Sequence, residues 1–236
     1  KKIPIRFTNY IFGEGAHSII IHKNKIILAA TDGETNSEKA TNEDFPEHLV
    51  SKIIVSDIQF NDNDIEIKNS KILNPFGCTH HHHYNDFVEY NNELIISALS
   101  YCDRKKLYIK KGVIFKYNIK NNETKIIVDG IDFPHSLNIT NNILYLCSSR
   151  LASILSINLE NITKKLEYKG PDVFLRGLEV TNDFFYIGNS SSLGRSKQKF
   201  ENNVKGIMIY NRNSGETKII SLPPEYDNVY YIKAIY

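Results

Sequence analysis

Short apolar segments alternate with polar turns along most of the chain, a pattern that predicts strands. Two stretches align without a gap: "HSLNITNNILYL" from His135 and "RGLEVTNDFFYI" from Arg176. A third, "NDFVEYNNELII" from Asn85, fits the same frame, and "HSIIIHKNKIIL" from His17 matches with a one-residue slip in its turn. An apolar strand, a tight turn containing Asn and a second apolar strand are typical of a β-hairpin. Each stretch is therefore predicted to be a hairpin.

A second hairpin follows each of these first ones. Residues 112–130 and 206–223 are near copies that share "ETKII" after a polar turn, and residues 152–170 and 51–73 occupy the same place in the pattern. The repeating unit is therefore four antiparallel strands. Units of this kind that recur every 40–50 residues, with extra length in loops, indicate a β-propeller.

The two ends of the chain are predicted to share one blade. "EYDNVYYIKAIY" supplies a further innermost strand that begins at Asp227, and "KIPIRFTNYIF" reads as the outer strand that precedes His17. Joining them would close the ring and remove exposed sheet edges. We therefore expect an all-β protein in which residues 1–236 form a single β-propeller domain, with five blades of four antiparallel strands.

The innermost strands of a propeller line its central channel. Five residues begin these strands, and we refer to them as anchors: His17, Asn85, His135, Arg176 and Asp227, which lie 68, 50, 41 and 51 residues apart. They are expected to form a ring at the mouth of the channel. Three long loops (30–51, 99–111 and 188–206) should open on the same face, and long loops on a rigid scaffold often carry function.

Histidines dominate the predicted ring. "THHHHY" directly precedes Asn85, and His83 is expected to aim its imidazole toward the axis, whereas residues 80–82 cannot all point inward because side chains alternate along an extended segment. His17, His83 and His135 are candidate ligands of a divalent metal (Zn²⁺, Mn²⁺ or Fe²⁺). Asp227 is a candidate ligand or base.

The remaining candidates have roles in substrate binding and proton transfer. Arg176 would hold an anionic group, and Asn85 would orient the substrate or water. Arg195 and Lys197 would reach the substrate from a loop, and Tyr84 and Tyr226 are candidate acids or bases. A structural alternative stays open, since polar residues at this position often bond neighbouring blades, and Arg176 with Asp227 would make such an ion pair.

Composition narrows the choice of partners. The net charge is +2, and Lys residues are scattered among Asp and Glu, so nucleic-acid binding is not expected. No run of about 18 apolar residues predicts a membrane span, and "KKIPIRF" lacks the apolar core of a signal peptide. Cys78, Cys102 and Cys147 lack CxxC spacing, so we expect reduced thiols in a cytoplasmic protein. The oligomeric state is left open.

From about residue 76 to its end the sequence resembles an uncharacterised bacterial β-propeller family of unknown function, marked by H-x-N-G-L, P-H-S, R-G-L and Y-D-V segments. Here these read "HYNDF" at 83–87, "PHS" at 134–136, "RGL" at 176–178 and "YDNV" at 226–229, with "GRSK" at 194–197 standing for the family's S-K-P-R loop. The likeness implies a propeller with a polar ring. The chain is also similar, more weakly, to gluconolactonase-like propellers and to peptidyl-hydroxyglycine lyases, which imply a metal at the axis.

Together these features predict a metal-dependent hydrolase or lyase that acts on a small polar, anionic substrate. The alternative is a propeller that binds a glycan or peptide without catalysis. Unlike residues at equivalent ring positions favour a single axial site, because a binding module would be expected to repeat its pockets from blade to blade.

Overall fold

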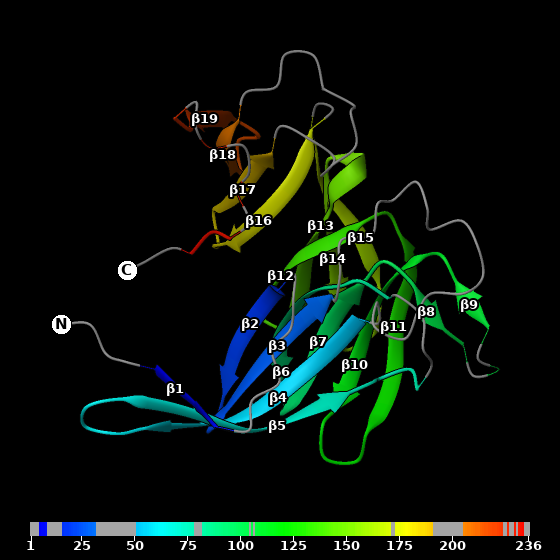
Figure 1. Ribbon diagram of the computed structural model, residues 1–236. Coiled ribbons are helices and arrows are strands. Elements are labelled where there is room, and N and C mark those ends of the chain that lie inside the picture. The colour runs from blue at the N-terminus through cyan, green and yellow to red at the C-terminus, as the bar shows by residue number, and fades with distance from the viewer. Residues whose placement is uncertain are drawn as a thin grey trace. The chain divides into compact units, whose positions relative to one another are not determined.

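The computed structural model describes residues 5–8, 16–31, 51–77, 82–103, 105, 107–170, 173–190, 205–223, 226, 229 and 231–233. The chain divides into two compact units, Lys1–Ile126 and Ile127–Tyr236. Strands dominate both units (Figure 1).

The strands follow one another in short steps. Their bounds are β1 Ile5–Thr8, β2 Ala16–His22, β3 Lys25–Thr31, β4 Ser51–Phe60, β5 Ile65–Leu73, β6 Tyr84–Tyr90, β7 Glu93–Ala98, β8 Tyr101–Cys102, β9 Tyr108–Ile109, β10 Gly112–Asn118, β11 Glu123–Ile131, β12 Pro134–Thr140, β13 Ile143–Ser148, β14 Ser153–Asn158, β15 Lys164–Lys169, β16 Phe174–Val180, β17 Phe184–Ser190, β18 Gly206–Asn211 and β19 Thr217–Ser221. A short 3-10 helix, η2 (Ser149–Leu151), follows β13.

The predicted hairpins and four-stranded sheets are confirmed. The sheets run β5-β4-β3-β2, β11-β10-β7-β6, β12-β13-β14-β15 and β16-β17-β18-β19, with antiparallel pairing inside the repeat, and β8 and β9 form a separate small hairpin. The turns that join the first two strands of the second and third sheets contain Asn91–Asn92 and Asn141–Asn142, all with positive φ. Two such residues in succession define the type I′ turn of a tight hairpin.

Hydrogen bonds between neighbouring sheets link equivalent positions of the repeat. Ser18 on β2 bonds Asp86 on β6, and both residues directly follow an anchor. The same position on β12 and β16 is linked by the Gly177 amide, which donates to Ser136 Oγ at 2.7 Å. The innermost strands of the first two sheets therefore lie side by side, and so do those of the last two, as in a propeller.

β1 differs from the predicted closing strand. It pairs in parallel with β5, with Ile5 opposite Ile65, and so adds a fifth strand to the outer edge of the first sheet. The described residues thus do not place the N-terminal strand in a shared blade with the C-terminal segment. The added strand covers backbone groups that would otherwise form an open edge.

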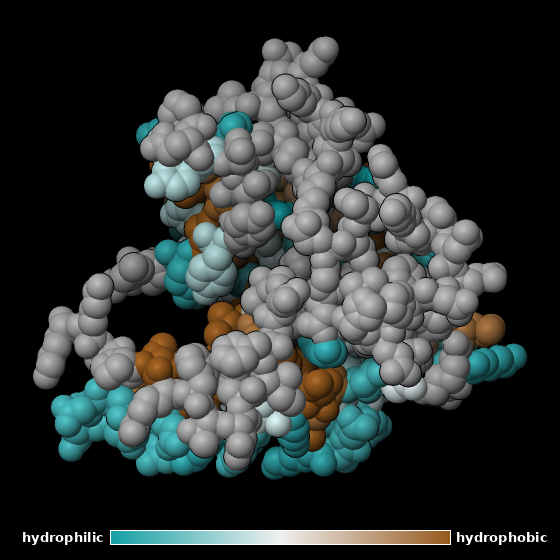
Figure 2. Space-filling model, in the orientation of Figure 1, coloured by the Kyte–Doolittle hydropathy of each residue, from teal (hydrophilic) through white to brown (hydrophobic). Residues whose placement is uncertain are grey.

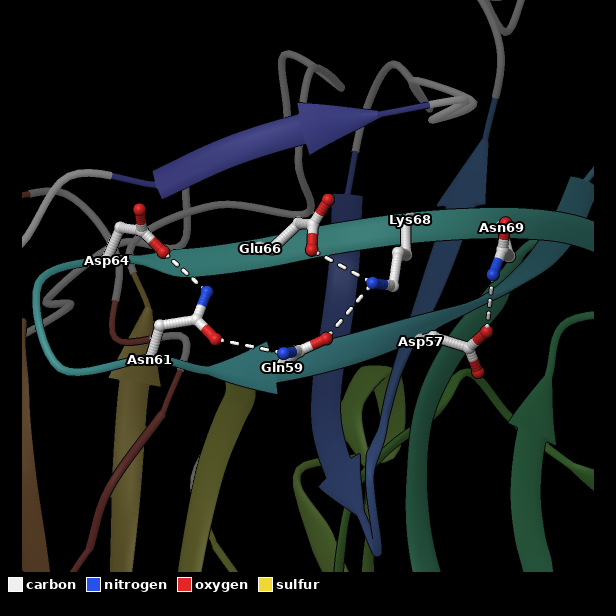
Figure 3. A network of polar contacts seen from close by, with 7 residues as sticks. All are labelled: Asp57, Gln59, Asn61, Asp64, Glu66, Lys68 and Asn69. Carbon is white, nitrogen blue, oxygen red and sulfur yellow. Dashed lines mark hydrogen bonds and ion pairs between the residues drawn. The ribbon is translucent and has the colours of Figure 1, made fainter.

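Polar side chains cover the β4–β5 hairpin beside β1. Lys68 Nζ donates to Gln59 Oε1 at 3.0 Å and contacts Glu66 Oε2 at 2.9 Å, and Asn61 Nδ2 donates to Asp64 Oδ1 at 2.6 Å (Figure 3). Hydrophilic residues likewise gather over the outer strands of the first unit (Figure 2). This end of the unit therefore presents a polar surface.

The C-terminal segment runs beside the innermost strand of the fourth sheet. Val229 is buried, its amide donates to Ser190 Oγ at 3.3 Å, and Lys233 Nζ lies 3.1 Å from Glu179 Oε1 on β16. Residues 229 and 231–233 have no strand pairing, so the further inner strand that begins at Asp227 stays a prediction. Close approach depends on Gly177 and Gly188, because a Cβ on either would meet Val229.

Candidate functional site

Every innermost strand is irregular at its anchor. The pairing register shifts between Ala16 and Ser18 in β2, Tyr84 and Asp86 in β6, His135 and Asn138 in β12, and Leu175 and Leu178 in β16. A bulge places an extra residue in one strand and redirects its side chain. The anchors therefore occupy the points where the strands can aim side chains away from the regular sheet.

The end of the histidine run is held by its backbone. His83 has a φ of 50°, and its amide donates to Ser51 Oγ at 2.7 Å, while the Leu99 amide donates to the His82 carbonyl at 3.0 Å. His83 is half-buried. His82, to which sequence reasoning gave no role, is fully buried and packs on Phe76 with ring centroids 4.9 Å apart.

Tyr84 lies in the hydrophobic core of the first unit. Its side chain is fully buried with Phe115 and Tyr117, and no hydrogen-bond partner for its hydroxyl is found among the described residues. Burial, and then the nearby Tyr117, raise the pKa of Tyr84 well above its ordinary value of 10.0. A raised pKa favours the neutral phenol, which can donate a proton but accepts one less readily, so the acid–base role of Tyr84 stays a prediction.

The turn before the third sheet repeats the geometry of the histidine turn. Phe133 also has a positive φ, 49°, and its carbonyl accepts from the Ser149 amide at 3.1 Å. The corresponding bond in the second sheet joins the Leu99 amide to the His83 carbonyl at 3.3 Å. Phe133 is thus the structural counterpart of His83, so only one of these two blades offers a histidine at this position.

His135 is oriented by contacts on both sides of its ring. Its Nδ1 lies 3.0 Å from the Phe133 carbonyl and 3.0 Å from Ser149 Oγ, and the ring packs edge-on against Phe174 at 5.6 Å between centroids. Because a carbonyl only accepts, Nδ1 carries the proton, and the lone pair of the neutral imidazole is on Nε2. This is the tautomer and orientation that histidine ligands of metals usually have.

Two arginines stack on the phenylalanines that surround His135. The guanidinium carbon of Arg176 lies 4.9 Å from the Phe174 ring centroid, and that of Arg150 lies 4.7 Å from the Phe133 centroid. The two rings meet edge to face at 6.3 Å. Stacking on an aromatic ring fixes the plane of a guanidinium group. In the second unit Arg176 and His135 thus both pack on Phe174, and Arg150, which the sequence did not indicate, lies on the adjoining Phe133.

The repeat contained a signal for part of this arrangement. The position two residues before an anchor is occupied by His83, Phe133 and Phe174 in three of the repeats. Aligning the repeats thus shows that two of them have a phenylalanine at this position. Arg150 lies in η2 and has no counterpart in that alignment. Its position follows only from the contact with Phe133.

The other predicted site residues are not brought together by the described structure. Asn85 is buried at the bulge of β6, and Tyr226 is 57% exposed with its amide bonded to the Pro223 carbonyl. The side chain of His17 and residues Asp227, Arg195 and Lys197 lie outside what the structure describes. Within the described ranges, no group of three or more His, Cys, Asp and Glu side chains is placed to hold a metal ion.

The cysteines differ from the expected set of reduced thiols. Cys102, at the end of β8, is disulfide-bonded, whereas Cys147 on β13 is a free buried thiol. The expectation is therefore wrong for Cys102. A disulfide is typical of proteins that fold in oxidising compartments. In the part of the chain that the structure covers, we find no helix of the length and apolar character needed to cross a membrane.

Comparisons with known proteins support the fold but assign no family and no activity. No family model and no curated protein matches the chain. The extracellular domain of a Bacteroides thetaiotaomicron protein described as a hybrid two component system is 11% identical, with a TM-score of 0.51 over 92% of this chain and 25% of that one.

Two further solved structures have slightly lower scores. The computationally designed Ika8 protein has 11% identity and a TM-score of 0.49, covering 92% of this chain and 51% of its own. A Bacteroides uniformis protein described as a 6-phosphogluconolactonase has 7% identity and a TM-score of 0.48, covering 86% and 70%. The chain thus spans about half the length of the designed protein and a quarter of the two-component protein. Its class is an all-β protein with a propeller-like fold.

Proposed function

We propose that the inner ends of β12 and β16 bind a small anionic ligand, with Arg176 as its anchor. The observation that carries this proposal is the Arg176 guanidinium stacked on Phe174 beside the oriented ring of His135. Arg150, stacked on Phe133, supplies a second cationic group. Paired guanidinium groups suit carboxylates and phosphates because their N–H donors match both oxygens of such a group.

Hydrolysis or lyase chemistry on this ligand is the reaction we propose, with a divalent metal as cofactor. His135 would offer Nε2 to the metal, with His17, His83 and Asp227 completing the ligand set. A bound Zn²⁺, Mn²⁺ or Fe²⁺ would lower the pKa of a coordinated water. The described histidines do not form such a site by themselves, so this part of the proposal depends on His17 and Asp227.

Anion binding is tested by titrating a panel of small carboxylates and phosphates into the protein in a calorimeter. Arg176→Gln should weaken binding at least about tenfold, the effect of losing roughly 1.4 kcal/mol of charged hydrogen bonding. Lys165→Gln is the matched control, because it removes one charge from an exposed side chain of the same unit. Equal affinity in the wild type and Arg176→Gln would refute the site.

Metal binding needs a separate measurement. Elemental mass spectrometry of tag-free protein should find near-stoichiometric zinc, manganese or iron that disappears in the His17→Ala/His135→Ala variant. The metal is refuted if the wild type stays metal-free after reconstitution and the double variant is equally stable. Anion binding would still be decided separately by calorimetry.

A glycan- or peptide-binding protein is the alternative, and one observation favours it. A groove of about 410 Å³ lies between β15 and the β18–β19 hairpin, lined by polar groups and by Tyr168 and Tyr210 among others. Aromatic rings with adjacent polar groups suit a sugar or an extended peptide. Binding on a glycan or peptide array that Tyr210→Ala removes and Arg176→Gln leaves unchanged would favour this function.

We further propose that the four sheets are blades of a five-bladed propeller of the uncharacterised family described above. Two residues after their anchors, Phe87, Leu137 and Leu178 are buried, whereas Ile19 at the same position is 59% exposed. An exposed apolar residue at an otherwise buried repeat position supports a further blade that packs on β2. The disulfide of Cys102 leads us to propose an oxidising compartment in place of the cytoplasm.

A further inference from the structure

β19 is the outermost strand of the fourth sheet, and no strand in the described part of the chain pairs with its outer edge. All five of its residues are exposed, and Ile219 and Ile220 have 43% and 49% of their surface accessible. Its pairing with β18 is regular from Thr217 to Ser221. Natural edge strands usually carry lysines, prolines or bulges that prevent pairing with another chain. β19 has one lysine and none of the other devices.

The neighbouring outer strand shows what a protected edge looks like. β15 contains Lys164, Lys165 and Lys169, and its pairing with β14 is interrupted by a register shift at Glu167. The outer edge of the first sheet is protected in another way, since β1 covers β5. Unlike β15 and the edge of the first sheet, β19 combines regular pairing with exposed apolar side chains and has no strand over it among the described residues.

The hydrogen bonds around β19 show which of its backbone groups point outward. The Asn211 amide donates to the Glu216 carbonyl and the Leu222 amide donates to the Lys205 carbonyl, both at 2.9 Å. In an antiparallel ladder, bonded pairs alternate with non-bonded pairs. Lys218 and Ile220 therefore turn their N–H and C=O groups toward β18, and Thr217, Ile219 and Ser221 turn theirs toward the open edge.

We propose that this edge binds a second copy of the chain, with the two β19 strands antiparallel about Ile219. In that register Ile219 pairs with Ile219 of the other copy, and Thr217 pairs with Ser221. All outward backbone groups of the strand are then used, and Lys218 lies opposite Ile220, so like charges do not face each other directly. A shift centred on Ser221 would bring in Pro223, which has no N–H to donate.

β15, in contrast to β19, is not suited to pair with a second copy of itself. Antiparallel pairing of β15 with itself about its centre would place Lys164 opposite Lys169 at both ends, and like charges in direct opposition destabilise a sheet. β19 is therefore self-complementary where β15 is not, and a symmetric edge of this kind gives a closed two-fold dimer.

Sedimentation velocity over a range of concentrations tests the proposal. The wild type should shift from monomer to dimer as concentration rises. Ile219→Lys should abolish the shift, because it sets two lysines against each other on the two-fold axis. Ile219→Pro should do the same while keeping the fold, since the N–H it removes points away from β18. Leu166→Lys, at a residue of β15 that is 56% exposed, is the control and should still dimerise.

Amide exchange on the wild type gives an independent result that needs no variant. The amides of Thr217, Ile219 and Ser221 should become protected as concentration rises, whereas those of Lys218 and Ile220 are protected throughout. A monomer at every concentration overturns the proposal. So does a dimer that survives both Ile219 variants or leaves the outward amides unprotected.

Discussion

Ser18 Oγ donates a 2.6 Å hydrogen bond to Asp86 Oδ1, and the two residues are equivalent positions of successive blades. Their counterparts Ser136 and Gly177 are also bonded to each other. One polar position of the repeat thus joins neighbouring blades in both units, next to the anchors that carry the candidate site. Polar residues near the start of an innermost strand therefore have a structural role here, because they bond one sheet to the next.

Asp86→Ala should lower the free energy of unfolding by about 1–3 kcal/mol, because the charged acceptor of Ser18 Oγ and of the Phe87 amide is lost. Urea unfolding measures the change. Asp62→Ala is the control, since Asp62 is exposed in a turn, and its effect should stay within about 0.5 kcal/mol. Equal effects of the two substitutions would mean that the bond to Ser18 contributes nothing.

Gly188→Ala should destabilise the second unit and weaken anion binding together. A Cβ at Gly188 would lie 1.8 Å from the Arg176 carbonyl oxygen and 2.7 Å from Val229 Cβ, so β16 must move. We expect a loss of roughly 1–3 kcal/mol in thermal or urea unfolding. Gly215→Ala, which meets nothing within 4 Å but has a φ of 78°, should cost about 1 kcal/mol and leave anion binding unchanged.

Glu167 should make stability depend on pH in the acid range. Burial alone would raise the pKa of this carboxyl, but hydrogen bonds from Ser156 and Lys165 outweigh it and hold the pKa below the ordinary value of 4.5. The ionised form therefore stabilises the fold above that value, and the contribution is lost as the pH falls through the lower folded pKa. Unfolding curves from pH 7 to pH 3 should fall less steeply for Glu167→Gln than for the wild type. Parallel curves would show that Glu167 is not stabilised in the fold.

Cys102 should resist alkylation in protein that is denatured without reductant, whereas Cys147 should react once unfolding exposes it. Peptide mapping by mass spectrometry identifies the labelled thiols. Adding a reductant before the alkylating agent should make Cys102 reactive, which serves as the control. Labelling of Cys102 without reduction, in protein purified from an oxidising compartment, would contradict the disulfide.

Ile19 provides a test of the proposed fifth blade. Phe87→Ala should cost about 3–5 kcal/mol because Phe87 is buried in the hydrophobic core of the first unit. If a further blade packs on β2, Ile19→Ala should cost about 2–5 kcal/mol as well, as expected for a buried isoleucine. Urea unfolding of both variants gives the comparison. A cost below about 0.5 kcal/mol for Ile19→Ala would mean that β2 ends the array.

The hairpins and their order could be read from the sequence because they depend on local features. Alternating apolar residues define the strands, and the pairs Asn91–Asn92 and Asn141–Asn142 adopt the positive φ that a two-residue turn requires. The anchors were found for the same reason, since a repeat places equivalent residues at equivalent bends. Even the interblade bonds follow the predicted spacing.

Side-chain direction and long-range pairing were decided only by the tertiary structure. The sequence predicted that His83 points inward, but the positive φ of His83 turns the chain so that the neighbouring His82 is the buried side chain. A shift of one residue along a strand moves a side chain from one face to the other. β1 pairs with β5 because the open edge of a sheet can form hydrogen bonds with a nearby strand. Such a pairing between distant segments has no signal in the local sequence. Arg150 became a candidate only through Phe133. The sequence by itself determined the repeat and its anchors, whereas contacts between distant segments decided which anchors have chemically useful neighbours.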